Sequence, residues 1–176
     1  MVARGIDIRT SLGNIILDNP VIPASGTFGF GEEFRELYDL NILGSISFKG
    51  TTCEPRQGNP LPRIAETPMG LINSVGLQNP GVEHVIKEEL PRLFETYRKP
   101  VIANISGFSI DEYVRLAESF EKVDQVGIIE VNIICPNVHN GGMAYGVCPE
   151  SAAEVTRAVK SVSSKPIYIK LSPNVT

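Results

Sequence analysis

Apolar and polar positions in this chain follow two alternating periods, which predict strands and helices in regular succession. Residues 82–97 carry apolar side chains three or four positions apart, the spacing of one helix face. Short apolar runs bounded by Gly, Pro or Asn predict buried strands instead. In chain order we expect a hairpin (5–8 with 14–17), a strand (20–26), a helix (32–40), a strand (42–48), a helix (82–97), a strand (100–106), a helix (109–123), a strand (127–134), a helix (149–161) and a strand (166–171).

Local signals fix some of these boundaries. Ser109 is followed three residues later by Glu112, which predicts a capping box at the start of a helix. Pro136 has no N–H and a fixed φ, so the strand before it should end there. Residues 51–81 are rich in Pro, Gly and Asn and show no clear period. We expect them to form a long loop, and a loop of that length inside a compact domain is usually functional.

The order of elements predicts one α/β domain over residues 1–176, with a parallel sheet and helices outside it. A doubly wound sheet and a barrel both fit this order. No Gly-x-Gly-x-x-Gly follows the first strand, which weakens the dinucleotide-binding form. Polar residues end every strand, as expected for a (β/α)₈ TIM barrel whose strand ends share one site. These residues are Ser25, Lys49, Asn104, Asn132 and Lys170.

Composition and charge exclude several classes of protein. The chain is 42% hydrophobic and 20% charged with a net charge of −4, which is ordinary for a soluble globular protein. The sequence has no block of like charges that would predict binding to nucleic acid or an anionic membrane. It also has no apolar run long enough to span a bilayer. The first residues do not resemble a signal peptide. The three cysteines are therefore interpreted as reduced thiols of a cytoplasmic protein.

The thiol of Cys135 lies just past a predicted strand, between Asn132 and Asn137. Loops at the carboxyl ends of strands carry the chemistry of α/β folds, so Cys135 is a candidate base or nucleophile. A buried, inert thiol is the alternative, because most free cysteines behave as small apolar residues. Cys135, His139 and Cys148 match no common zinc spacing, and we expect no metal site.

Two lysines, Lys49 and Lys170, each end an apolar strand. Strand alternation puts Ser45, Ser47 and Lys49 on one face, and a lysine on an inner face is costly unless it meets an anion or an acceptor. The alternative is that each side chain extends to solvent at the strand end. Two such lysines on different strands favour an anionic ligand.

Asparagines recur at the same predicted edge. Asn104 and Asn132 lie on strands, whereas Asn73 and Asn79 lie in the long loop. Carboxamides offer both donors and acceptors, which suits a planar ligand such as a pyrimidine or an isoalloxazine edge. A turn or cap role is the alternative, and we favour it for Asn73 or Asn79 taken singly. Glu130 shares a strand face with Asn132, and we expect it to be structural.

Four segments together resemble class 1 dihydroorotate dehydrogenases, and most closely the NAD-linked class 1B branch. The resemblance runs in order along essentially the whole chain. It rests on Phe-Lys-Gly-Thr-Thr (48–52), Asn-Ser-Val-Gly-Leu-Gln-Asn-Pro (73–80), Asn-Ile-Ile-Cys-Pro-Asn-Val (132–138) and Ile-Lys-Leu-Ser-Pro-Asn (169–174). The family is a (β/α)₈ barrel with FMN at its carboxyl face, and it oxidises dihydroorotate to orotate in pyrimidine biosynthesis.

The resemblance implies roles for individual residues. Cys135 would be the base that removes the C5 proton, while the C6 hydride passes to FMN. Substrate would be contacted by Lys49, Asn73, Val75, Gly76, Leu77, Asn132 and Asn137. FMN would be bound by Ala24, Ser25, Lys49, Asn104, Asn132 and Lys170. The implied partners are a second copy in a homodimer and an FAD and iron–sulfur subunit that passes electrons to NAD.

The resemblance stops after the fifth predicted strand, whereas a closed barrel has eight strands and about 250 residues. We therefore expect the N-terminal part of a barrel, five β/α units preceded by a hairpin, without the later loops that grip the FMN phosphate. Such a chain is expected not to hold FMN tightly alone. The alternatives are an inactive half-barrel fragment or interaction module, and a related flavin barrel acting on another dihydropyrimidine.

Overall fold

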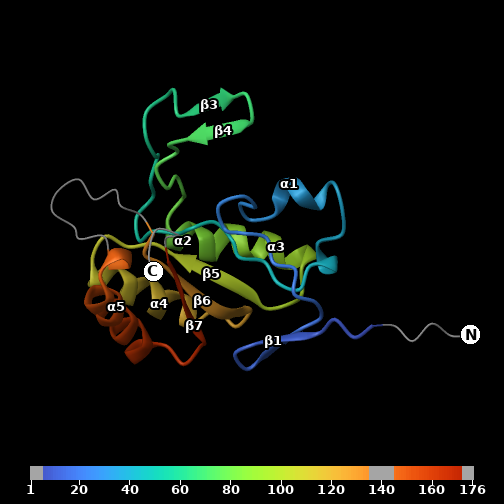
Figure 1. Ribbon diagram of the computed structural model, residues 1–176. Helices are drawn as coiled ribbons and strands as arrows, with labels where there is room; N and C mark the ends of the chain where they lie inside the picture. The colour runs from blue at the N-terminus through green and yellow to red at the C-terminus, as the bar shows by residue number, and fades with distance from the viewer. Residues whose placement is uncertain (1–5, 135–144, 172–176) are drawn as a thin grey trace, which may run out of the picture.

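A parallel sheet forms the centre of the computed structural model, which describes residues 6–134 and 145–171. Its strands are β5 (Val101–Ile105), β6 (Val126–Asn132) and β7 (Ile167–Lys170), hydrogen-bonded in that order (Figure 1). Residues 45–51 run parallel to β5, through bridges from Ser47 to Ile102 and from Thr51 to Ile105. The predicted strand 42–48 is therefore present only as bridges. The expected α/β architecture with a parallel sheet is confirmed.

Helices cover the sheet as the alternating pattern predicted. Helix α4 (Ile110–Glu121) packs on β5 and β6, and α5 (Pro149–Val162) packs on β7 and on α4. A short 3₁₀ helix (Tyr145–Val147) precedes α5. The predicted capping box is present in a modified form: the Ser109 side chain accepts from the Glu112 backbone N–H at 3.3 Å, while the Glu112 carboxylate accepts from the Phe108 N–H at 2.6 Å. The first bond satisfies an amide that the first turn leaves open, and the second holds the chain just before the helix.

The predicted helix 82–97 consists of three joined parts: α2 (Val82–His84), a π-helical turn (Val85–Glu89) and α3 (Leu90–Thr96). Pro91 cannot donate the usual i→i−4 bond, and the turn before it widens to i→i−5 bonding. The apolar face predicted from the sequence is buried, with Val85, Leu90 and Leu93 at most 3% exposed. The local irregularity therefore leaves the packing of this helical segment intact.

The main core lies between the sheet and these helices. Phe48 and Phe120 are fully buried, with ring centroids 5.6 Å apart. Burial of an aromatic or large aliphatic side chain stabilises the fold by about 1.5–3 kcal/mol. Phe48 precedes Lys49, so this packing fixes the position from which the predicted site lysine extends.

The N-terminal hairpin is confirmed, although its first strand was placed too early. β1 (Thr10–Leu12) pairs antiparallel with β2 (Ile15–Leu17), and the turn between them contains Gly13. Gly13 has a φ of +64°, a left-handed conformation that glycine adopts without steric cost because it has no Cβ. A Cβ on Gly127 would lie 2.7 Å from Ile15 Cδ1, which shows how closely the hairpin approaches the amino end of β6. The hairpin therefore covers the end of the sheet opposite the predicted site.

Three further sequence expectations were wrong. Residues 20–26 form no strand, because Pro20 and Pro23 lack the N–H groups that a ladder needs. The helix expected over 32–40 is cut to α1 (Glu32–Arg35), followed by a 3₁₀ helix (Leu40–Ile42). The long loop contains an antiparallel hairpin of β3 (Ile64–Thr67) and β4 (Gly70–Asn73).

The β3–β4 hairpin stands apart from the body of the molecule (Figure 1). All eight strand residues are exposed, so neither face had to be apolar and no period-2 pattern arose in the sequence.

Within the described ranges, no helix combines the length and apolar character needed to cross a bilayer.

Candidate active site

Polar side chains from adjacent strands meet at the carboxyl edge of the sheet. Asn104 of β5 is paired in register with Glu130 of β6, and Asn132 of β6 is paired with Lys170 of β7. Asn104 is completely buried, while Asn132 and Lys170 are partly exposed. The three residues predicted at strand ends therefore lie at one edge of the sheet.

The carboxylate of Glu130 connects this group. Its Oε1 accepts a hydrogen bond from Asn104 Nδ2 and lies 3.5 Å from Ser47 Oγ and 3.9 Å from Lys170 Nζ. In this ion pair the Lys170 side chain is 31% exposed and the Glu130 side chain is 22% exposed, so water screens the attraction between them. Glu130 thus contacts two residues of the candidate site, Asn104 and Lys170, as a structural residue between them would.

Ser25 reaches the same edge from a distant part of the sequence. Lys170 Nζ donates to Ser25 Oγ at 3.2 Å across 145 positions, and the Ser25 side chain is only 3% exposed. Ala24 and Ser25 line a cavity of about 350 Å³ whose polar wall is formed by Ser47, Glu130 and Lys170. Four sequence-predicted cofactor residues, Ser25, Asn104, Asn132 and Lys170, are therefore joined through hydrogen bonds and the Glu130 carboxylate.

Asn132 secures the end of β6. Its Nδ2 lies 3.4 Å from Asn104 Oδ1, and its Oδ1 accepts from the Ile134 backbone N–H at 3.2 Å. The Asn132 carbonyl accepts from the Tyr113 hydroxyl of α4 at 2.8 Å. Sequence reasoning missed Tyr113, because an aromatic residue on the buried face of a helix gives no sign of a polar contact.

Lys49 and Leu77 approach the group from neighbouring segments. The half-buried Lys49 is fixed by its backbone N–H, which donates to the Gly29 carbonyl at 2.8 Å. A Cβ on Gly50 would lie 2.8 Å from Asn104 Oδ1 and 3.2 Å from Leu77 Cδ1. Glycine at position 50 therefore allows the loop that bears Leu77 to lie against Asn104.

The predicted substrate segment is only partly joined to this group. Val75, Gly76 and Leu77 are half-buried, whereas Asn73 ends β4 with an exposed side chain that forms no hydrogen bond to Asn104 or Asn132. Cys135 and Asn137 lie outside the described residues. The positions proposed for the base and for one substrate contact therefore remain sequence-based predictions.

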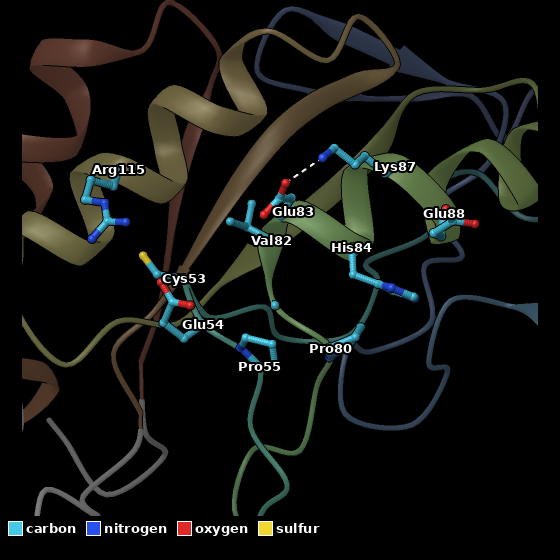
Figure 2. A pocket seen from close by; sticks show the side chains of 11 residues that line it. Cys53, Glu54, Pro55, Pro80, Val82, Glu83, His84, Lys87, Glu88 and Arg115 are labelled. Atoms are coloured by element: carbon cyan, nitrogen blue, oxygen red, sulfur yellow. Dashed lines mark hydrogen bonds and ion pairs between the residues drawn. The ribbon is translucent and has the colours of Figure 1, made fainter.

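A second cavity, of about 480 Å³, is lined by Cys53 and by residues of α2 (Figure 2). Glu54, Glu83, Lys87 and Arg115 line it with both signs of charge. Burial raises the pKa of the Cys53 thiol, and the Arg115 charge opposes this effect without reversing it. A nucleophilic thiol needs a lowered pKa, so the edge of the sheet is the better candidate active site.

The chain also matches known proteins in sequence. A family model described as "Dihydroorotate dehydrogenase" matches residues 8–176. The chain is 54% identical over 169 residues to the "Dihydroorotate dehydrogenase B (NAD(+)), catalytic subunit" of Anoxybacillus flavithermus, covering 96% of this chain and 54% of that protein. The protein of the same name from Geobacillus kaustophilus gives the same identity and coverage. The chain thus spans about half the length of the curated relatives it matches.

A solved structure shares the fold at much lower identity. DHODH from Eimeria tenella, determined in complex with ferulenol, superposes with a TM-score of 0.73 at 17% identity, covering 97% of this chain and 53% of that chain. At this identity the likeness shows the fold alone.

Proposed function

The chain belongs to the dihydroorotate dehydrogenase family, and from this premise we propose that it contributes to an FMN site that oxidises dihydroorotate to orotate in pyrimidine biosynthesis. One observation carries the proposal: Ser25, Asn104, Asn132 and Lys170, far apart in sequence, converge on one strand edge around Glu130. Convergence of this kind is what a (β/α)₈ barrel produces at its carboxyl face. We propose that the parallel sheet is part of such a barrel.

The residues at the edge fit a flavin. An ammonium group, a hydroxyl and two carboxamides supply the donors and acceptors that suit the ring nitrogens and carbonyls of a planar heterocycle. Lys170 would stabilise negative charge developing on the ring, because its ammonium group lies at this polar edge. When bound, FMN supplies the hydride acceptor of the reaction.

Residues of this chain would hold the substrate and move its proton. Lys49 provides a positive charge for the carboxylate of dihydroorotate, while Asn73, Val75, Gly76, Leu77, Asn132 and Asn137 would provide the remaining contacts. Cys135 would take the C5 proton as a thiolate. The C6 hydrogen leaves with its bonding electrons, and the C5–C6 double bond of orotate forms.

Partners are proposed from the names of the relatives and from the sequence resemblance. The name of the Anoxybacillus flavithermus protein specifies a catalytic subunit and NAD(+). We propose a separate subunit with FAD and an iron–sulfur centre that passes electrons to NAD, and a homodimer of the catalytic chain. A cytoplasmic location remains an expectation from the sequence.

Replacement of the proposed base tests the assignment in the complete protein that carries this chain. Cys135→Ala should reduce dihydroorotate turnover by about 100- to 10,000-fold, the usual contribution of a general base, while orotate binding is retained. Turnover is measured by dihydroorotate-dependent dye reduction, and orotate binding by the change in the flavin spectrum.

Cys148→Ala is the matched control, because the Cys148 thiol instead contacts Glu150 Oε2 at 3.0 Å near the start of α5. The control should keep its turnover. Equal turnover in Cys135→Ala and the wild type would remove Cys135 as the base. Faster turnover of dihydrouracil than of dihydroorotate would instead favour another dihydropyrimidine as the substrate.

A further inference from the structure

The Asn79 carboxamide ties together two segments that lie against the candidate site. Its Oδ1 accepts from the backbone N–H groups of Thr52 at 3.1 Å and Gly81 at 3.0 Å. Its Nδ2 donates to the Leu77 carbonyl and to Thr52 Oγ1, both at 2.9 Å. Asn79 is only 5% exposed, so these bonds are made away from competing water.

These contacts use the full capacity of the carboxamide, two donated and two accepted bonds. The Thr52 hydroxyl is free to accept from Asn79, because it donates its own hydrogen to the Glu54 carbonyl at 2.6 Å. The Asn79 backbone is held independently, by paired bonds to Arg56 at 2.8 and 3.1 Å. The side chain is therefore not needed for the local pairing of residue 79, and its bonds serve to join Thr52 with Leu77.

Leu77 is the residue that most needs such support. Its φ of +58° is left-handed, a conformation that costs a residue with a Cβ about 1–2 kcal/mol. Its neighbour Gly76, at φ +77°, takes a similar conformation without that cost. The Leu77 side chain lies beside Gly50 and Asn104, so the unusual backbone directs it at the site. The bond from Asn79 to the Leu77 carbonyl holds this geometry.

We propose that Asn79 is a positioning residue that keeps Leu77 and the 49–52 segment in fixed relation, so that two proposed substrate contacts, Leu77 and Lys49, are held in place before the substrate binds. The inference rests on the proposed function, because Lys49 and Leu77 are the proposed substrate contacts. Asn79 itself touches the site only through Thr52 and Leu77. The bonds of Asn79 to Leu77 and Gly81 fit the turn role expected for Asn79 taken singly, whereas its bonds to Thr52 join it to a different segment.

Two variants of the complete, flavin-loaded protein separate the contributions of this side chain. Asn79→Ala removes all of its bonds, whereas Asn79→Asp keeps an acceptor for Thr52 and Gly81 but turns a carboxylate oxygen toward the Leu77 carbonyl. Both should raise the orotate Kd and the dihydroorotate KM by about 10- to 100-fold, as expected when groups that position a substrate shift by ~1 Å. Flavin content should remain close to that of the wild type.

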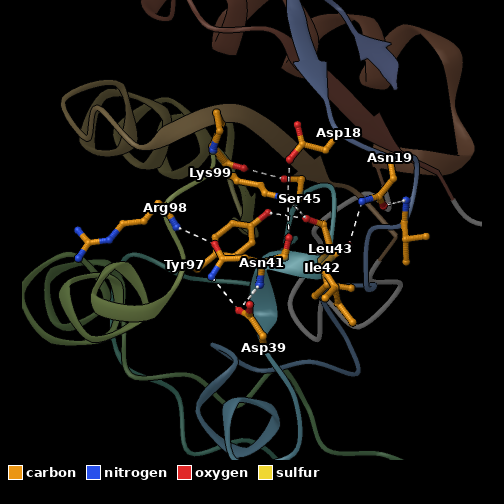
Figure 3. Close-up of polar contacts among 12 residues, drawn as sticks. Asp18, Asn19, Asp39, Asn41, Ile42, Leu43, Ser45, Tyr97, Arg98 and Lys99 are labelled. Carbon is orange, nitrogen blue, oxygen red and sulfur yellow. Dashed lines mark hydrogen bonds and ion pairs between the residues drawn. The ribbon is translucent and has the colours of Figure 1, made fainter. Parts of the chain in front are cut away.

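Asn41→Ala is the matched control, because Asn41 contacts Thr96 and Lys99 in the segment just before β5 (Figure 3). The Asn41 carboxamide also bridges distant segments, donating to the Thr96 carbonyl at 2.7 Å and to Asp39 at 2.9 Å. Its loss should lower stability without raising the orotate Kd. An orotate Kd that rises equally in Asn41→Ala and Asn79→Ala would indicate general loosening and overturn the inference.

Hydrogen exchange of the Thr52 and Gly81 amides gives a readout that does not depend on turnover. Asn79→Ala should accelerate exchange at both amides, and Asn41→Ala should not. Wild-type orotate affinity in both Asn79 variants overturns the positioning role but leaves the proposed function standing. A wild-type protein that binds flavin but shows no response to orotate contradicts the proposed function itself, and the substrate-positioning role falls with it.

Discussion

Single polar residues decide how a lysine can lie on the inner face of this sheet. The ammonium of Lys170 meets Ser25 Oγ at 3.2 Å and the Glu130 carboxylate at 3.9 Å, which offsets the cost of its partial burial. Alternation along the strands was enough to predict the face of Lys170. The contact with Ser25 could not be predicted, because it depends on the path of a segment 145 residues away.

Ser106 directly follows β5 and tests whether the buried hydroxyl groups near the polar edge all need a hydrogen-bond partner. Among the described residues, its Oγ is a buried side-chain oxygen without a hydrogen-bond partner. Ser106→Ala removes an unpaired buried hydroxyl and should raise the free energy of unfolding by about 1 kcal/mol, as measured by urea denaturation.

Ser45→Ala is the comparison for Ser106→Ala. Ser45 is equally buried, and its Oγ donates to the Pro100 carbonyl at 2.9 Å. Its replacement should lower the free energy of unfolding by about 1 kcal/mol. Equal destabilisation by the two substitutions would show that the Ser106 hydroxyl has a partner after all.

At the level of elements, the sequence predicted best where burial was complete. β5 is buried at every position, and its mostly apolar sequence placed it within one residue of the expected boundaries. The β3–β4 hairpin was missed for the opposite reason: no face of it is buried, so nothing in its sequence alternates. The segment 20–26 looked apolar enough for a strand, but its prolines exclude it from a ladder.

The junction between α4 and the loop before β7 depends on Glu121. Its carboxylate accepts from the Ser163 hydroxyl at 2.6 Å and from the Ser164 N–H at 3.2 Å. Desolvation alone would raise the pKa of Glu121, but the hydrogen bonds from Ser163 and Ser164 outweigh it and hold the pKa at about 2. The bonds therefore favour the charged carboxylate in the folded protein.

The stability that this junction contributes should fall in acid. Because the folded pKa lies below the unfolded value of 4.5, the contribution is complete above that pH and is lost as the pH falls toward 2. Glu121→Gln should therefore cost about 1 kcal/mol at pH 7, a figure discounted for solvent screening, and progressively less below the unfolded pKa. Urea denaturation across this range measures the difference, and an identical cost at every pH would contradict this account.

For the whole molecule, the four motifs predicted the family that the comparison then identified over residues 8–176. The fold is kept at 17% identity to the Eimeria tenella structure, which shows how little of the sequence the architecture requires. The candidate site draws on a few residues, and Asn104, Asn132 and Lys170 converge there because β5, β6 and β7 lie parallel in that order. Residues beyond hydrogen-bond reach of that edge, such as Asn73, could be assigned only by resemblance.

The most direct test is the absorbance of the flavin under anaerobic conditions, in the complete protein that carries this chain. We predict that the protein contains FMN and that dihydroorotate bleaches its flavin absorbance, whereas dihydrouracil does not. Lys170→Gln should weaken FMN retention in the same preparation, because it removes the positive charge at the polar edge. A bound flavin that keeps its full absorbance in the presence of dihydroorotate would contradict the account.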